Sequence, residues 1–250
     1  MNNFDGCSPR YFAPPFLISI IDYDIIIAME VNRMSTMKIM TVRCGVCRSE
    51  SRQRVLTSTN AFGAPDLDLR PPEMQRSTMS MWLAECPVCG YVAPSISEPT
   101  RVSRELLDSK EYRGTGGIFF ESELARRFYR HYLISKRSGK VKDAFYAALH
   151  AAWASDDAWD ADNAREMRLL SLRELDALMK MKRGDETLLL VKCDIMRRAG
   201  LFDELIALYS ETRLTEKLPN EILAFQLERA RARDSARYTV SDARADDGEA

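Results

Sequence analysis

The pattern of apolar and polar positions changes character near residue 100. Before that point, short runs of β-favouring residues alternate with loops. From Arg101 onward Ala, Leu, Glu, Arg and Lys dominate, and apolar residues recur every three to four positions, as on one face of a helix. We therefore predict an α+β protein, with a small β domain over residues 38–100 and an all-α stack of helical hairpins over residues 101–238.

Helix start and stop signals divide the second part into six predicted helices. Asp162 and Asp185 are predicted N-caps, and Gly184 and Gly200 are predicted helix ends. The stretch 197–209 resembles the turn of a tetratricopeptide repeat, although Leu205 takes the place of the usual alanine and no strict 34-residue period recurs. The predicted helices span residues 121–136, 143–155, 162–183, 185–199, 202–211 and 219–234.

The two ends of the chain differ from the rest. Residues 16–29 are the most apolar run, but 14 residues are fewer than the roughly 20 that span a bilayer, and Asp22 and Asp24 lie within the run. No small-residue cleavage site follows, so a signal peptide is not expected. A strand over 18–27 is one alternative. The other is a start at Met34 or Met37, with residues 1–37 unstructured or mis-assigned. Residues 239–250 are predicted to be a disordered acidic tail.

Two C-x-x-C pairs with 38 residues between them are the main chemical feature. Each short turn brings two thiolates to the same side, and two pairs supply the four soft ligands of a closed tetrahedral site. Structural Zn²⁺ is the predicted cofactor; iron in a rubredoxin-like site is the less favoured alternative, because Cys-Pro-x-Cys-Gly suits both metals. The predicted metal ligands are Cys44, Cys47, Cys86 and Cys89.

β-Favouring segments flank each cysteine pair, so each pair is predicted to form the turn of a hairpin. Residues 38–42 and 53–59 flank the first pair, and residues 81–85 and 91–93 flank the second. Gly90 follows the second pair, where the backbone must curl with positive φ. Arg48 holds the corresponding position after the first pair, so that turn should be more strained.

The insert between the pairs contains a polar motif in a loop stiffened by prolines. Asp66, Asp68 and Arg70 alternate with Leu67 and Leu69, so the charges share one side and the leucines the other. One interpretation is a prepared surface for a ligand or partner. The favoured interpretation is an internal Asp–Arg brace, anchored by the leucines.

A local excess of arginine surrounds the first cysteine pair. It consists of Arg43, Arg48, Arg52 and Arg54, against the single acidic residue Glu50. Such a hairpin can contact nucleic acid phosphates, and it can equally be a solvated face that balances the negative charge of four thiolates. These arginines are candidates for an interaction surface.

Composition sets limits on function. The 250 residues include 36 basic and 37 acidic residues, so no global charge favours nucleic acid or an anionic membrane. Six cysteines are too few for a disulfide scaffold, and their pairing fits a reducing compartment. We therefore expect a cytoplasmic protein that does not enter a membrane.

The chain resembles a bacterial family known as domain of unknown function 2225. The resemblance covers roughly residues 38–238 and leaves the first 33 unmatched. It implies a cysteine-pair metal ribbon joined to tetratricopeptide-like helices, without an established activity. The residues that carry it are Cys44-x-x-Cys47, Asn60, Phe62, Asp66-Leu67-Asp68, Arg70-Pro71, Cys86-Pro87-x-Cys89-Gly90-Tyr91 and Arg197-Arg198-Ala199-Gly200-x-Phe202.

These features predict a non-enzymatic structural-zinc protein that serves as a scaffold for another protein. There is no Gly-rich phosphate loop, no Ser/His/Asp set and no metal ligand set with an open position. Two alternatives remain: a nucleic-acid-binding zinc ribbon, which is not favoured, and a thiol-based redox or zinc sensor.

Overall fold

The computed structural model describes residues 35–114 and 117–244. The alternatives for the N-terminal segment, a strand over 18–27 or a later start, lie outside these residues, as does the end of the predicted acidic tail, 245–250.

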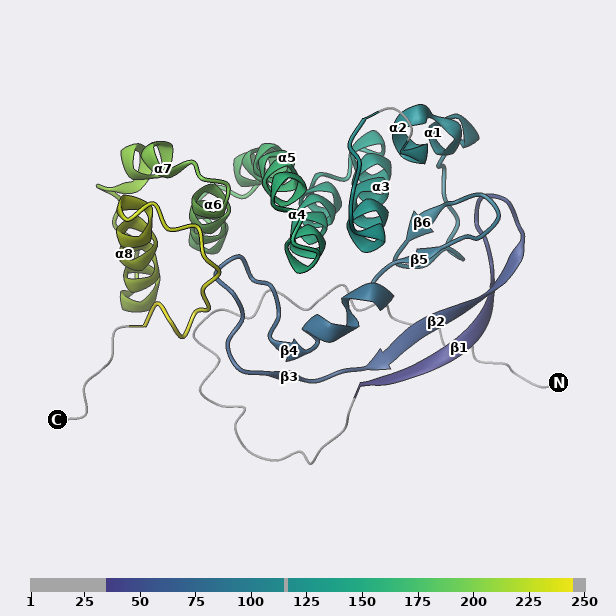
Figure 1. Cartoon of the computed structure of the whole chain (residues 1–250), viewed down its shortest axis with the longest axis horizontal. Coiled ribbons are helices and arrows are strands. Elements are labelled where there is room, and N and C mark those ends of the chain that lie inside the picture. Colours follow the sequence, from purple (N-terminus) through teal and green to yellow (C-terminus); the bar gives the residue numbers. More distant parts are fainter. Residues whose placement is uncertain (1–34, 115–116, 245–250) are drawn as a thin grey trace.

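The β elements form three separate antiparallel pairs (Figure 1). The longest is a hairpin of β1 (Thr36–Arg43) and β2 (Glu50–Ser58), with the first cysteine pair in its turn. Two shorter pairs follow, and a 3-10 helix lies between them. They are β3 (Ala61–Phe62) with β4 (Glu73–Met74), η2 (Arg76–Met81), and β5 (Ala84–Glu85) with β6 (Val92–Ala93).

Six longer helices follow two short ones. Each of the six overlaps a predicted helix, whereas the two short ones were not predicted. Asp185 is confirmed as an N-cap, because its side chain accepts a hydrogen bond from the Leu188 amide. Asp162 is not the cap of α5; Asp160 caps it by accepting from Asn163. The bounds are α1 (Arg104–Asp108), α2 (Lys110–Arg113), α3 (Glu123–Arg137), α4 (Val141–Asp157), α5 (Ala161–Met181), α6 (Glu186–Arg198), α7 (Phe202–Tyr209) and α8 (Lys217–Arg231).

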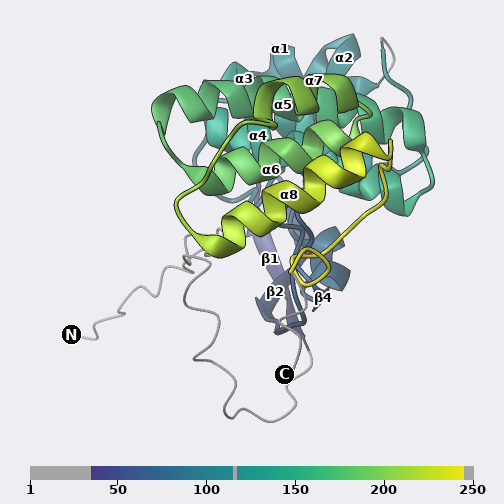
Figure 2. The same cartoon turned by 90° about the vertical axis from the view of Figure 1, so that its left-hand side faces the viewer.

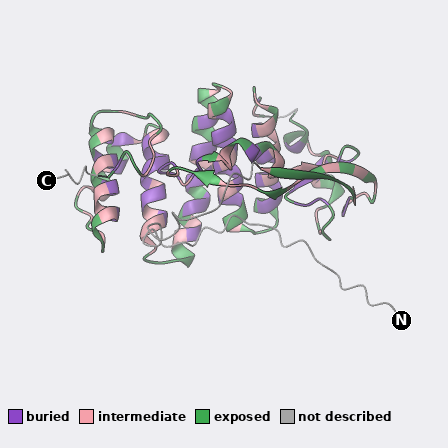
Figure 3. Cartoon of the chain, turned by 90° about the horizontal axis from the view of Figure 1, so that it is seen from below, coloured by how far each residue is buried: buried purple, intermediate pink, exposed green. Residues whose placement is uncertain are grey.

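Helices α3 to α8 stand side by side in a stack, and the β elements cross one side of it (Figures 1 and 2). Helices α4, α6 and α8 lie on the side that faces the insert, while α5 and α7 lie on the other side. The burial of the residues fits this arrangement (Figure 3). The hairpin of β1 and β2 is largely exposed, whereas the sides of the helices that face their neighbours are buried. The insert therefore spans the inner side of the stack.

The predicted β part and the predicted helical part share two hydrophobic cores. In the larger core, Leu67, Met79 and Leu83 of the insert pack with buried residues of the helices such as Trp153. In the smaller core, the cysteines of the two C-x-x-C pairs pack with Tyr132 and other residues of α1 to α4. Each core contains residues from before and after residue 100. The stability of the β part and that of the helical part therefore depend on each other.

The C-terminal segment closes over the insert. Asp66 forms a β-bridge with Thr239, the Val240 amide donates to the Pro65 carbonyl at 2.9 Å, and the Leu67 amide donates to the Tyr238 carbonyl at 2.9 Å. Residues 239–244, predicted to begin a disordered tail, are instead ordered, because backbone hydrogen bonds hold them to residues 65–67.

The polar motif of the insert is internal. Asp66, Asp68 and Arg70 are each at most 2% exposed, which excludes them from an exposed interaction surface. The favoured interpretation, an internal brace, is therefore correct about burial, and the ionic partners of the three residues lie outside the motif. Asp66 binds Arg76 at 2.6 Å, Arg70 binds Asp157 at the end of α4, and Asp68 binds Arg198 of α6 at 3.3 Å.

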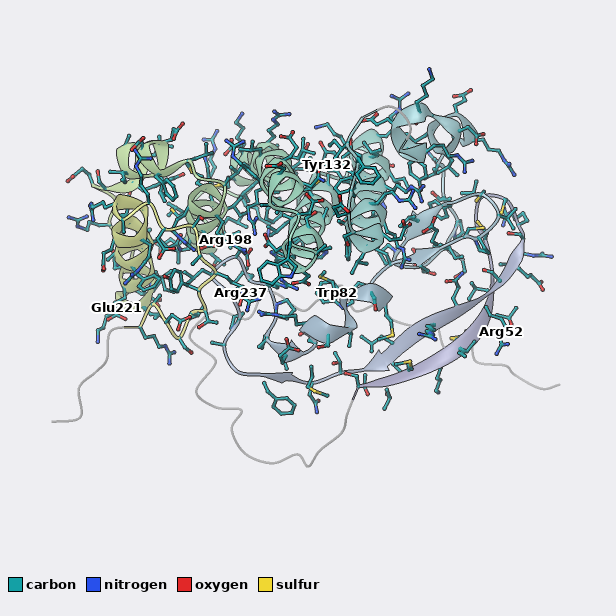
Figure 4. The ribbon with its side chains drawn as sticks, in the orientation of Figure 1. Arg52, Trp82, Tyr132, Arg198, Glu221 and Arg237 are labelled. Carbon is teal, nitrogen blue, oxygen red and sulfur yellow. The ribbon has the colours of Figure 1, made fainter. Side chains whose placement is uncertain are left out.

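Asp68 also binds the buried Trp153 of α4, whose indole Nε1 donates to Oδ2 at 2.7 Å. Arg198 in turn binds Asp156 at 2.7 Å. In Figure 4, Arg198 of α6 and Trp82 of the insert lie where the stack and the insert face each other. The insert is thus held to α4 and α6 by buried charged hydrogen bonds, which are strong when every partner is present.

Replacing Asp68 with alanine should lower the free energy of unfolding by about 3–5 kcal/mol, because Trp153 Nε1 and Arg198 would lose a buried acceptor. Asp68→Asn keeps an acceptor for the indole, so the free energy of unfolding of this variant should fall by less. Urea unfolding measures both, and exposed Asp162→Ala is the control. An Asp68→Ala protein as stable as the control would contradict this account.

His150 of α4 is partly buried and packs among aromatic side chains. Its ring centroid lies 4.7 Å from that of Trp153 and 5.0 Å from that of Trp82, and Phe128 and Tyr146 also contact it. Burial lowers the pKa of His150 from 6.5 to about 3, so the imidazole is neutral in the fold. Its contacts are with aromatic rings, and it is not part of the possible metal-binding group found among the described residues.

Since unfolded His150 takes up a proton near pH 6.5 and folded His150 does not, the fold should lose stability as pH falls from 6.5 towards 3. His150→Phe keeps the ring contacts and removes the proton. Between pH 6 and pH 5 it should lose about 1 kcal/mol less stability than the wild type. Urea unfolding at both pH values checks this; parallel losses in the two proteins would show that His150 does not titrate in this way.

Candidate metal centre

The four predicted ligands converge on one point. Their sulfur atoms all lie within 4.8 Å of one another. The Sγ atoms of Cys44 and Cys89 are 3.8 Å apart, and those of Cys47 and Cys86 are 3.5 Å apart. A tetrahedron with metal–sulfur bonds of about 2.3 Å has edges of about 3.8 Å, so these distances fit a bound ion. They are too long for disulfides, and all four cysteines are free.

The two cysteine pairs sit in equivalent turns. In the first, the Arg48 amide donates to the Cys44 carbonyl at 3.0 Å; in the second, the Gly90 amide donates to the Cys86 carbonyl at 2.9 Å. Gly90 has φ 71° and Arg48 has φ 65°. The prediction for Gly90 is confirmed, and Arg48 adopts the same left-handed conformation, where a side chain costs energy.

Polar groups surround the sulfur atoms. The Val46 amide donates to Cys44 Sγ at 3.4 Å, and Ser49 Oγ lies 2.9 Å from Cys47 Sγ and 3.4 Å from Cys86 Sγ. A hydroxyl between two sulfur atoms can donate its proton to either of them, which favours the thiolate form of the sulfur that accepts it. Ser49 was not among the predicted site residues.

The hydrogen bonds and the burial around the site shift the pKa values of the four thiols in different directions. The hydrogen bond from Ser49 lowers the pKa of Cys47 to about 6. Burial opposes ionisation of Cys86, but hydrogen bonds from Ser49 and from the Cys89 and Val88 amides together lower its pKa. Burial raises the pKa of Cys44 and Cys89. A cation at the centre of the four sulfurs would compensate the buried thiolates, which is the environment a structural metal needs.

Gly45 allows another loop to approach the first turn closely. Its amide donates to the Ile96 carbonyl at 2.7 Å, and a Cβ at this position would lie 2.2 Å from the Glu98 carbonyl oxygen. Only glycine fits there. The sequence offers a weak signal in the glycine of Cys-Gly-x-Cys, but it does not reveal which segment approaches.

Two residues tie the second turn to the helices. Tyr112 of α2 donates its hydroxyl to the Gly90 carbonyl at 2.7 Å. Arg130 of α3 donates to the Tyr112 carbonyl at 2.9 Å and binds Glu85 of β5 at 2.8 Å. Sequence reasoning missed both residues, because no local pattern links positions that are 18 to 45 residues apart in the chain.

Three of the four candidate arginines share the outward face of the β1–β2 hairpin. The register places Arg43 opposite Glu50, Arg52 opposite Thr41 and Arg54 opposite Ile39, so all three side chains point the same way. Gln53 points inward and donates to the Glu85 carbonyl at 3.0 Å. Figure 4 shows Arg52 on the hairpin, away from the stack. Arg48, the fourth candidate, is also exposed, but it lies in the turn between the two strands.

The arrangement provides four sulfur ligands and leaves no open position for water or substrate. Among the described residues, these cysteines are the one group of His, Cys, Asp and Glu side chains close enough to hold a metal ion. Buried Cys193 lies in the larger core. Every helix in the described part of the chain is too short or too polar to cross a bilayer.

The chain was compared with protein-family models, with curated proteins and with solved structures, and none of the three comparisons found a match. The resemblance to domain of unknown function 2225 therefore stays a prediction.

Arg48→Gly should raise the free energy of unfolding by about 1 kcal/mol, because glycine adopts positive φ without the steric cost of a side chain. The reciprocal change, Gly90→Ala, should lower it by a similar amount. Lack of space is not the reason, since the nearest atom to an added Cβ, Arg113 Nη1, would be 3.7 Å away. Urea unfolding of the metal-loaded proteins tests the pair; shifts of the same sign would refute the explanation.

Proposed function

We propose that this protein is a non-enzymatic scaffold in which a structural zinc ribbon fixes a platform of tetratricopeptide-like helical hairpins that binds another protein. The observation that carries the proposal is the closed four-cysteine centre, whose ligands pack in the same core as α1 to α4. An ion held there contributes to folding and has no position left for catalysis.

Zinc is the metal we assign to the site. Four thiolates in tetrahedral geometry suit zinc and iron alike. Zinc has no redox chemistry, which fits a site whose surroundings serve packing and thiolate stabilisation. Iron bound in the protein from its native source would replace this assignment without changing the structural role of the centre.

The helical stack supports the scaffold role. Helical hairpins in a row present extended surfaces to partners. In this chain, residues 65–70 and the C-terminal segment cover the inner side of α4 and α6, and Asp68 is bound to both helices. A partner would therefore contact the outer side of the stack or its edges.

Protein isolated from its native source should contain one zinc ion per chain and should co-purify with another protein. Elemental analysis and mass spectrometry of the same sample measure both. Metal-free protein would contradict the zinc assignment, and a pure single species under gentle conditions would contradict the scaffold.

Cys86→Ser is the matched variant for the metal. It should lose zinc, and the loss should destabilise the ribbon by an amount on the order of 10 kcal/mol, as in zinc-finger peptides. Since Cys86 packs with residues of α3 and α4, the helices should also unfold at a lower temperature. Cys193→Ser, at a buried position outside the site, should retain zinc.

A nucleic-acid-binding ribbon is the second candidate, and the shared outward face of Arg43, Arg52 and Arg54 favours it. Exposed arginines on one face can contact successive phosphates. We rank it below the scaffold because the face carries no exposed aromatic side chain on which a base could stack.

If this candidate is correct, the protein should be retained on RNA or DNA at low salt, and retention should fall steeply as salt rises. The double variant Arg52→Glu, Arg54→Glu should abolish retention, whereas Arg173→Glu, an exposed site on α5, should not. Absence of retention at low salt would remove the candidate.

A further inference from the structure

The turn between α4 and α5 carries an unusual residue. Trp159 is 94% exposed, the highest value among the exposed large apolar side chains of the described residues, and its backbone has φ 59°. Positive φ is rare for a bulky residue. The conformation belongs to a helix-ending turn in which the Asp160 amide donates to the Ser155 carbonyl at 3.0 Å.

The same turn ends three other helices and shows what the position normally holds. After α3 and α6 the residue is glycine, Gly139 with φ 67° and Gly200 with φ 76°. After α8 it is Arg233, whose side chain binds Asp203 and lies over the Phe202 ring, so it contributes contacts to the fold. Trp159 has neither the conformational freedom of glycine nor such contacts.

A second exposed aromatic residue lies on the neighbouring segment. Phe119 is 76% exposed, and its carbonyl accepts a hydrogen bond from Asn163 Nδ2 at 2.7 Å. Asp160, next to Trp159, accepts from the Glu121 amide at 3.2 Å. These two hydrogen bonds hold the loop before α3 against the start of α5. Two large aromatic side chains thus lie exposed on adjoining segments, as in an aromatic anchor of a protein interface.

The surroundings of this aromatic pair are acidic. Segments 117–123 and 157–162 contain five acidic residues and neither lysine nor arginine. Arg70 binds Asp157, and Arg126 binds Glu123. Glu121 and Asp162 are exposed, and no ion pair is found for either within the described residues. Aromatic ring faces and free carboxylates both attract cations.

We infer that Phe119 and Trp159, with Glu121 and Asp162 beside them, form a docking site for a lysine- or arginine-bearing segment of a partner protein. The inference rests on the proposed scaffold function and names the partner class and the site. The rings provide apolar area and cation–π contact, and the carboxylates select positive charge. The Arg43, Arg52 and Arg54 face belongs to the hairpin and is separate from this site.

The test uses the full zinc-loaded chain and two fluorescent 12-residue peptides. One alternates arginine with leucine, and the other carries glutamate in place of each arginine. Fluorescence anisotropy should show binding of the basic peptide only. Trp159→Gly should weaken it at least tenfold while keeping or raising the melting temperature, because glycine suits the turn. Phe119→Ala should weaken binding similarly, and Met181→Ala, at a site 73% exposed elsewhere, should not.

Several outcomes would overturn the inference: no binding of the basic peptide, equal binding of the acidic one, or unchanged binding by Trp159→Gly. Sedimentation that shows a dimer abolished by Trp159→Gly would identify a second copy as the occupant instead. The scaffold proposal is judged separately. A co-purified partner whose binding is insensitive to Trp159→Gly would leave the scaffold intact and remove this site, whereas absence of any partner would remove both.

Discussion

The whole fold depends on how the insert between the two cysteine pairs is held. At its ends, four sulfurs within 4.8 Å of one another can be joined by one ion. In its middle, Asp68 binds Trp153 of α4 and Arg198 of α6. Bringing distant cysteines together costs loop entropy, which an ion must offset. The buried charges then determine where the closed loop lies on the stack.

This arrangement makes the candidate metal centre part of the helical core. Tyr112 and Arg130 bind the second turn and β5 directly, and the site cysteines pack with α1 to α4. A buried arginine or aspartate is stabilising only while its partner stays in place. Loss of an ion bound there would therefore loosen the insert, and a loosened insert would leave charged groups of α4 and α6 without partners.

Local patterns in the sequence were sufficient for the parts of the fold that local chemistry determines. The spacing of Cys44, Cys47, Cys86 and Cys89 identified the site, Gly90 identified the turn, and helical periodicity located six helices. An internal position for Asp66, Asp68 and Arg70 was the favoured interpretation, but the sequence did not reveal their partners, because alternation shows which residues share a side but not what covers that side. Their partners lie 10 to 130 residues away. The ordering of residues 239–244 was missed for the same reason, since it depends on backbone hydrogen bonds to residues 65–67.

The insert covers the inner side of the helical stack, and this limits which surfaces can bind a ligand or a partner. A stack of helical hairpins usually offers its concave side to a peptide, and here the chain's own residues 65–70 occupy the side of α4 and α6 that faces the β elements. What remains exposed differs in charge from place to place, with arginines on the hairpin and carboxylates beside Phe119 and Trp159. A protein with a formal net charge of −1 can therefore attract ligands of opposite sign at separate sites, because recognition depends on the local field and not on the total charge.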